Sequence, residues 1–214
     1  MKTTAYNEID LENWKNYPEI RTDSCWEDKV NAYEQIYKRY TKRNDLVLDI
    51  FCSSKSAKEE AQKLERLYFE IENYEYDKSL YDVINNRLEE LGQKNIQLLL
   101  LTPDLNDVRA NNEEKFFNTF KQFAKLGIQK LEQGRFVVLI IGNTYSNSTL
   151  HLEAYEYAQF LINQGLRLKA HIVKEVWKWS TLESSTAKAL WHYRALRGGF
   201  NVATFKNIFI FEKL

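Results

Sequence analysis

The sequence predicts an α/β fold: a doubly wound, mostly parallel sheet with an antiparallel edge at its C-terminal end. The first observation is that short apolar runs alternate with segments of helical periodicity, five times in succession. This alternation is typical of βα units, whose apolar strands form a parallel sheet covered by helices on both faces. The second observation is that the last two apolar runs, 200–204 and 208–211, have no helix between them. Strands connected so closely are expected to run antiparallel.

The elements follow one another without a gap that would divide the chain. Residues 1–22 show no period and are interpreted as an irregular N-terminal arm. Ser24 and Glu27 have the spacing of a capping box, which predicts a helix from there to about Lys42. Apolar strands are predicted at 46–51, 66–71, 96–101, 136–141 and 166–177. Amphipathic helices are predicted at 55–65, 76–91, 113–132 and 151–163. We expect one domain over 23–214, with 177–200 as a mobile insertion that contacts nucleic acid or a partner.

Several aromatic residues are expected in the core. Phe116, Phe120 and Phe123 recur on one face of the predicted helix 113–132, which is the pattern of a buried stripe. Trp26 is interpreted as a core residue in preference to a platform that stacks on a cofactor. Cys52 is expected to be a small buried residue, because nothing near it in sequence would lower the pKa of its thiol.

Composition excludes several classes of protein. Thirty basic and thirty acidic residues give a formal net charge of zero, so no overall field attracts nucleic acid or a membrane surface. No apolar run is long enough to cross a bilayer, and the first ten residues do not resemble a signal peptide. Two distant cysteines and three scattered histidines show no disulfide or zinc pattern. These features predict a cytoplasmic protein without a metal site.

The segment 45–56 carries a resemblance to a known cofactor motif. It reads DLVLDIFCSSKS, and it resembles the D-P-F-C-G-S-G-T motif, with its preceding strand, of S-adenosylmethionine-dependent DNA amino-methyltransferases. These enzymes modify adenine N6 or cytosine N4. The resemblance implies a Rossmann-like methyltransferase fold and S-adenosylmethionine as the cofactor. It implies cofactor contacts at Asp49, Phe51, Ser53 and Glu72, with Glu72 as the acid that binds the ribose hydroxyls.

The loop after the predicted strand 96–101 lies at the position of the family's catalytic motif. Thr102-Pro103-Asp104-Leu105 is similar to [D/N/S]-P-P-[Y/F/W], in which the first side chain and the first proline carbonyl accept hydrogen bonds from the target amine. The resemblance therefore places Thr102, Pro103 and Asp104 at the catalytic positions. Leu105 replaces the aromatic residue that stacks on the flipped base, and such stacking contributes about 1–3 kcal/mol per base.

The cofactor loop also departs from the family. Ser53 and Lys55 stand where the family has glycines, which allow a sharp turn and a close approach to the ligand. A lysine there would also bring a cation toward the positive sulfonium. Three interpretations follow. The favoured one is a catalytically impaired subunit that supports DNA methylation by an active partner. The second is a divergent but active methyltransferase. The third is a Rossmann-like protein unrelated to methylation, such as a non-enzymatic DNA-binding protein.

A segment near the C-terminus mixes basic and aromatic residues. This composition indicates either a nucleic-acid groove, with DNA favoured over RNA, or a protein interface, which we favour slightly. The partner would be an active methyltransferase subunit or a second copy of the chain. S-adenosylmethionine is the expected cofactor if the chain is active, and no cofactor is expected otherwise. The contact residues singled out are Lys178, Lys188, Trp191, Arg194 and Arg197.

Overall fold

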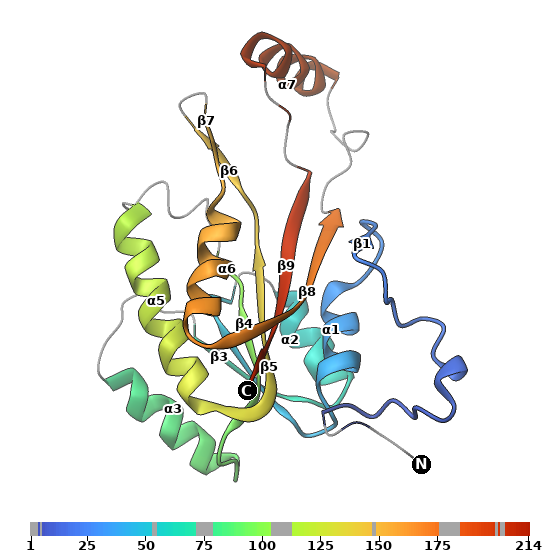
Figure 1. Ribbon diagram of the computed structural model, residues 1–214, viewed down its shortest axis with the longest axis vertical. Helices are drawn as coiled ribbons and strands as arrows, with labels where there is room; N and C mark the ends of the chain where they lie inside the picture. The colour runs from blue at the N-terminus through green and yellow to red at the C-terminus, as the bar shows by residue number, and fades with distance from the viewer. Residues whose placement is uncertain are drawn as a thin grey trace.

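The computed structural model contains one large mixed sheet and a small hairpin (Figure 1). It describes residues 4, 6–52, 55–71, 79–103, 113–146, 149–175, 185–199, 201 and 204–214. Among these residues, seven strands form a sheet in the order β1-β8-β9-β5-β4-β2-β3. The strands are β1 Cys25–Trp26, β2 Leu46–Ile50, β3 Leu67–Ile71, β4 Ile96–Leu101, β5 Leu131–Ile141, β8 Leu166–Glu175 and β9 Phe205–Lys213. The hairpin consists of β6 Thr144–Ser146 and β7 Thr149–His151.

Helices cover both faces of this sheet. Residues of α1 and α2 pack in one buried cluster, and residues of α3, α5 and α6 pack in the other, on the opposite face. The helices are η1 Trp14–Asn16, α1 Ala32–Tyr40, α2 Lys55–Lys63, α3 Ser79–Glu90, α5 Glu113–Lys130, α6 Glu153–Asn163 and α7 Ser185–Gly198. Within the part of the chain that the structure describes, no helix has the length and apolar character needed to cross a membrane.

The predicted fold class is confirmed. Strands β3, β2, β4 and β5 are parallel neighbours, and β9 pairs antiparallel with both β5 and β8. The antiparallel part of the sheet is therefore formed by the C-terminal strand, which lies between β5 and β8. The apolar runs that identified β2 and β4 are buried along their whole length, as expected for strands covered on both faces.

The predicted capping box at Ser24 is wrong. Residues 25–26 form β1, which pairs in parallel with β8, and α1 begins at Ala32. Its N-cap is Asn31, whose side chain accepts hydrogen bonds from the amides of Tyr33 and Glu34. The reason is a long-range contact that no local pattern reveals. The ammonium group of Lys174, on β8, binds the backbone carbonyls of residues 27 and 28 and so holds this segment against the sheet.

Three further predictions of elements are corrected. The expected strand 208–211 lies within β9 and is extended at both ends, whereas residues 200, 202 and 203 of the expected strand 200–204 lie outside the described residues. Within the segment 177–200, expected to be a mobile insertion, residues Ser185–Gly198 form the helix α7. The hairpin β6–β7 was not predicted, because its strands are only three residues long. β9 is longer than predicted because it forms ladders with a neighbour on each side.

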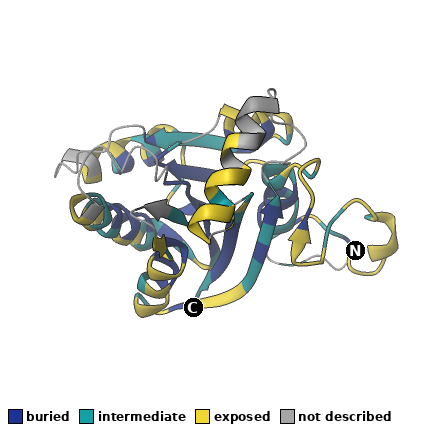
Figure 2. Ribbon diagram, turned by 90° about the horizontal axis from the view of Figure 1, so that it is seen from above, coloured by how far each residue is buried: buried dark blue, intermediate teal, exposed yellow. Residues whose placement is uncertain are grey.

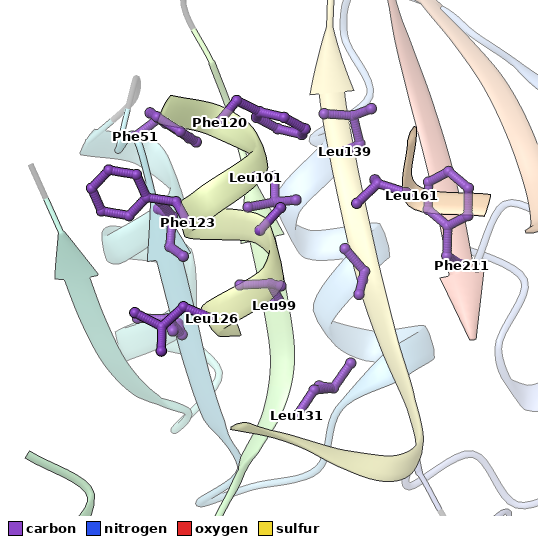
Figure 3. Packing of buried hydrophobic residues seen from close by; sticks show 14 of the residues in the cluster. Phe51, Leu99, Leu101, Phe120, Phe123, Leu126, Leu131, Leu139, Leu161 and Phe211 are labelled. Atoms are coloured by element: carbon purple, nitrogen blue, oxygen red, sulfur yellow. The ribbon is translucent and has the colours of Figure 1, made fainter. Parts of the chain in front are cut away.

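The core confirms the aromatic stripe of the long helix. Phe120 and Phe123 of α5 are fully buried, and Phe116 is partly buried against the same cluster. Figure 3 shows Phe120 and Phe123 beside Leu99 and Leu101 of β4. Trp26 is buried, as predicted. Figure 2 shows the contrast between the buried central strands and the exposed arm and α7.

Candidate functional site

The carboxyl ends of β2, β3 and β4 meet at one point of the sheet. The chain passes from β2 to β3 on one side and later returns to β4 on the other side of β2. In an open α/β sheet, the crevice at such a switch point is where ligands bind. Asp49 lies opposite Glu70 of β3 and Leu100 of β4, and Thr102 follows β4 directly. Two residues predicted from separate motifs are thus neighbours here.

Asp49 is the buried centre of this site. Its side chain has no exposed surface, and both of its oxygens accept hydrogen bonds. The phenol of Tyr68 donates to Oδ2 over 2.5 Å, and the hydroxyl of Thr102 donates to Oδ1 over 3.3 Å. Burial raises the pKa of Asp49 to about 7, although these two hydrogen bonds act in the opposite direction. Asp49 therefore binds its neighbours, and neither of its oxygens is exposed to a ligand.

A second polar group surrounds Glu70, which the sequence did not single out. Its carboxylate forms an ion pair with Lys58 of α2 and accepts a hydrogen bond from the thiol of Cys52 over 3.3 Å. The hydrogen bond from Lys58 keeps the pKa of Glu70 below its usual value. Burial raises the pKa of Cys52 to about 11, so the thiol stays protonated and is a poor nucleophile. One signal could have found this cluster: residues 68 and 70 are two apart on a strand and so share a face.

The loop after β2 has an unusual backbone. Phe51 and Cys52 have φ values of 78° and 20°, in the left-handed region that favours glycine. Such a conformation costs about 1–3 kcal/mol in a residue with a side chain. The ring of Phe51 packs among Phe116, Phe120 and Phe123, with centroid distances of 5.5 to 5.9 Å. Figure 3 shows Phe51 beside Phe120 and Phe123. The ring predicted to contact a cofactor is therefore a core side chain, and that contact would fall to the backbone of Phe51.

The remaining predicted residues fall into four groups. Thr102 and Pro103 are buried at the end of β4. Lys55 is the exposed first residue of α2, and Arg194 and Arg197 are exposed on α7. For Lys188 and Trp191 the structure describes only the helical backbone. Four predicted site residues lie outside the described residues: Ser53, Glu72, Asp104 and Lys178.

The hairpin β6–β7 and helix α7 project from the same end of the sheet as the site (Figure 1). The base of the hairpin is fixed to α6, because Glu153 accepts hydrogen bonds from the amide and the hydroxyl of Thr144. Asn143 accepts from the amide of Ala154 in addition. Large apolar side chains are exposed on both projections, at Leu150 and Leu152 and at Leu190, Tyr193 and Leu196.

Among the described residues of the site, neither carboxylate is without a partner in the protein, and Glu72, the acid that the resemblance assigns to the ribose of S-adenosylmethionine, lies outside the described residues. This cofactor carries a positive sulfonium and needs acceptors for its ribose hydroxyls. Asp49 uses both oxygens within the protein, and Glu70 is neutralised by Lys58. Two lysines, Lys55 and Lys58, lie on α2, the helix that follows the loop after β2. No group of His, Cys, Asp and Glu among the described residues is arranged to hold a metal ion.

Comparisons with known proteins give similarities of structure only. No protein-family model matches the sequence, and no curated protein matches it. A proposed DNA modification methylase from Thermus thermophilus shares 10% identity, with a TM-score of 0.42 over 56% of this chain and 45% of that one. TrmN from Thermus thermophilus shares 15%, with a TM-score of 0.44 over 81% and 45% of the two chains. A methyltransferase from Pyrococcus furiosus shares 12%, with a TM-score of 0.44 over 83% and 79%. Similarities at this level carry no argument about activity.

Proposed function

We propose that this chain is a methyltransferase-fold protein, related to the DNA N6-adenine and N4-cytosine methyltransferases, that has lost catalysis. In this role it supports methylation of a nucleic acid, DNA in preference to RNA, by an active partner subunit. The proposal rests on two motif-like segments, 45–72 and 102–105, that resemble that family but lack its glycines and its stacking aromatic residue. The site described above supports the loss of function at both segments.

The observation that carries the proposal is the burial of Thr102. In the resembling family, the residue at this position accepts a hydrogen bond from the target amine, so it must face the substrate. Thr102 has only 2% of its surface exposed, and its hydroxyl donates to Asp49. The oxygen assigned to the amine contact is thus buried, away from a substrate. Leu105 offers no aromatic face for the flipped base.

Isothermal titration of the purified chain with S-adenosylmethionine tests the cofactor half of this proposal. We expect no saturable heat, which corresponds to a dissociation constant above about 1 mM. The double variant Ser53→Gly, Lys55→Gly restores the two expected glycines and is expected to gain binding without gaining methyl transfer, because Leu105 is unchanged. Tight binding by the natural sequence would contradict the proposal.

A methyl-transfer assay on DNA separates the two closest alternatives. The impaired subunit transfers no methyl group alone, and it copurifies with a methyltransferase whose rate falls when the chain is removed. Transfer by the purified chain alone would instead support the divergent active enzyme, and Thr102→Ala should then abolish that transfer.

Helix α7 is the element we assign to contact with nucleic acid or the partner. From Ser185 to Gly199 the sequence contains Lys188, Arg194 and Arg197 and no acidic residue. If α7 contacts the phosphate backbone, replacing Arg194 and Arg197 by Ala is expected to weaken the binding of DNA and to reduce its dependence on salt. If the isolated chain binds no DNA, α7 is assigned to the protein partner.

A further inference from the structure

The N-terminal arm and α1 enclose two adjoining pockets at the edge of the sheet opposite to the candidate site. Their volumes are about 520 and 210 Å³, and both are lined by Ile9, Tyr17 and Ile20, so the two pockets adjoin and are together referred to as the groove. Arg43 and Arg66, which line the smaller pocket, precede β2 and β3. The groove therefore lies at the amino ends of these strands, whereas Asp49 and Thr102 lie at the carboxyl ends. Figure 1 shows the arm extending beside α1.

Aromatic rings dominate the larger pocket. It is lined by Tyr6, Trp14, Tyr17 and Tyr40. Trp14 presents 63% of its surface to solvent from η1, although it lies beside a hydrophobic pocket. Tyr6 and Tyr40 are fixed from behind, because each packs on Phe136 with centroid distances of 4.8 and 4.7 Å. An exposed ring beside fixed rings is a platform on which a planar group can stack.

Cations outnumber carboxylates along the groove. Each of the three lining carboxylates already has a cationic partner, through the pairs Glu8–Arg66 at 3.2 Å, Glu65–Arg43 at 3.7 Å and Glu19–Lys38 at 3.6 Å. Lys15 and Arg39 line the aromatic pocket, where no carboxylate is among the lining residues described. Their charged groups lie over the rings of Trp14 and Tyr40, at 5.7 and 5.3 Å, and neither forms an ion pair within the described part of the chain.

We propose that this groove binds single-stranded nucleic acid. Aromatic platforms combined with positive charge are the features by which proteins bind single strands, since bases stack on the rings and phosphates lie near the cations. Unpaired bases are required, because the bases of a duplex are stacked within it and cannot reach Trp14. A net charge of zero means that such a polyanion must be attracted locally, and the groove supplies that local excess. The inference is independent of the function proposed for the opposite edge of the sheet.

Fluorescence anisotropy of a labelled oligothymidine of about 12 nucleotides, titrated with the full chain at about 50 mM salt, tests the proposal. Trp14→Ala is expected to weaken binding by about 10-fold, because it removes one stacking platform. Lys15→Gln is expected to reduce the slope of log affinity against log salt by about 0.7. Trp14→Phe keeps a ring and should retain binding within about threefold of the natural sequence.

Tyr81→Ala is the matched control. Tyr81 is also an exposed aromatic residue with a lysine over its ring, Lys130 at 4.2 Å, but it lies on α3 and lines neither pocket. This variant should bind the oligonucleotide as the natural sequence does. Three results would overturn the proposal: no binding by the natural sequence at low salt, equal binding by Trp14→Ala, or equal binding of a duplex of the same length. The titration with S-adenosylmethionine tests the candidate site at the carboxyl ends of the strands, so a failure of one proposal can be distinguished from a failure of the other.

Discussion

Asp49 illustrates how much a single side chain depends on its surroundings. It is a carboxyl group without exposed surface, held by one phenol and one hydroxyl, and burial raises its pKa to about 7 from 3.8. Between these two values the folded protein keeps a proton on Asp49 that the unfolded chain loses. The free energy of unfolding therefore falls as pH rises from about 4 to about 7, by about 1.4 kcal/mol per pH unit at most.

Replacing Asp49 by Asn tests this linkage. The amide keeps a polar group in the same position but cannot ionise, so the variant should gain stability relative to the natural sequence as pH rises. We expect the difference in the free energy of unfolding to change by up to about 4 kcal/mol between pH 4 and pH 8, measured by urea denaturation. Asp82→Asn, a change at an exposed position of α3, is the control and should show no such trend. A difference that is constant with pH would contradict the expectation.

The sequence identified Asp49 and Thr102 from separate motifs, and the structure brings them within hydrogen-bond distance at 3.3 Å. It did not reveal that they bind each other, because a motif specifies residue types and spacing but not the direction of a hydroxyl. Tyr68 and Glu70 were missed for a related reason. The register with the resembling family drew attention to Glu72, beyond the end of β3, and away from the strand itself.

At the scale of elements, α5 packs closely on β4 at Gly127, which leaves less room for a Cβ atom than the other described glycines do. A Cβ atom added at Gly127 would lie 2.7 Å from both terminal methyl carbons of Leu99. Leu99 is fully buried in the middle of β4, so it cannot move aside without disturbing its neighbours. Glycine at this position lets the helix approach the sheet, although it lowers helix propensity.

Gly127→Ala should therefore destabilise the protein by about 1–3 kcal/mol, as overpacking of a core usually does. The measurement is a shift of the urea midpoint at constant slope. Gly142→Ala is the matched control, because a Cβ atom there would have no neighbour within 4 Å. If Gly127→Ala proves as stable as the control, the close packing of α5 on β4 is not the reason for this glycine.

For elements with a strong hydrophobic period, the sequence predicted their existence and type more accurately than the residues at which they begin and end. The central strands β2 and β4 and the long helix α5 follow from local apolar patterns, with shifts of a few residues. The start of α1 did not, because Ser24 and Glu27 satisfy a local rule that a distant lysine on β8 overrides. β1 is only two residues long and pairs with a strand far along the chain, so no local pattern indicates it.

At the scale of the whole molecule, α7 differs from every other long helix described. Its residues 192–194 and 196–199 are exposed, and it stands apart from the sheet in Figure 1. An isolated helix of this length is marginally stable in water, because helix nucleation is unfavourable. The helix is thus expected to open locally while the sheet remains folded.

Amide hydrogen exchange measures this difference. Amides of α7 should exchange several orders of magnitude faster than those of β4 and β5, whose exchange requires global unfolding. Addition of the molecule that α7 contacts should slow exchange in α7 alone. Equal protection of α7 and β4 in the free chain would show that the helix is held in place by the protein itself.

The position of β9 has a consequence for biosynthesis. It is made after both β5 and β8, and it fills the space between them, with ladders to both. Until residue 213 has left the ribosome, those two strands each present a row of unpaired amides and carbonyls, beside apolar surfaces that Phe209 and Phe211 later cover. A nascent chain halted before β9 is complete therefore exposes two strand edges that can pair with other chains. Its protection from self-association then depends on chaperones or on rapid completion of synthesis.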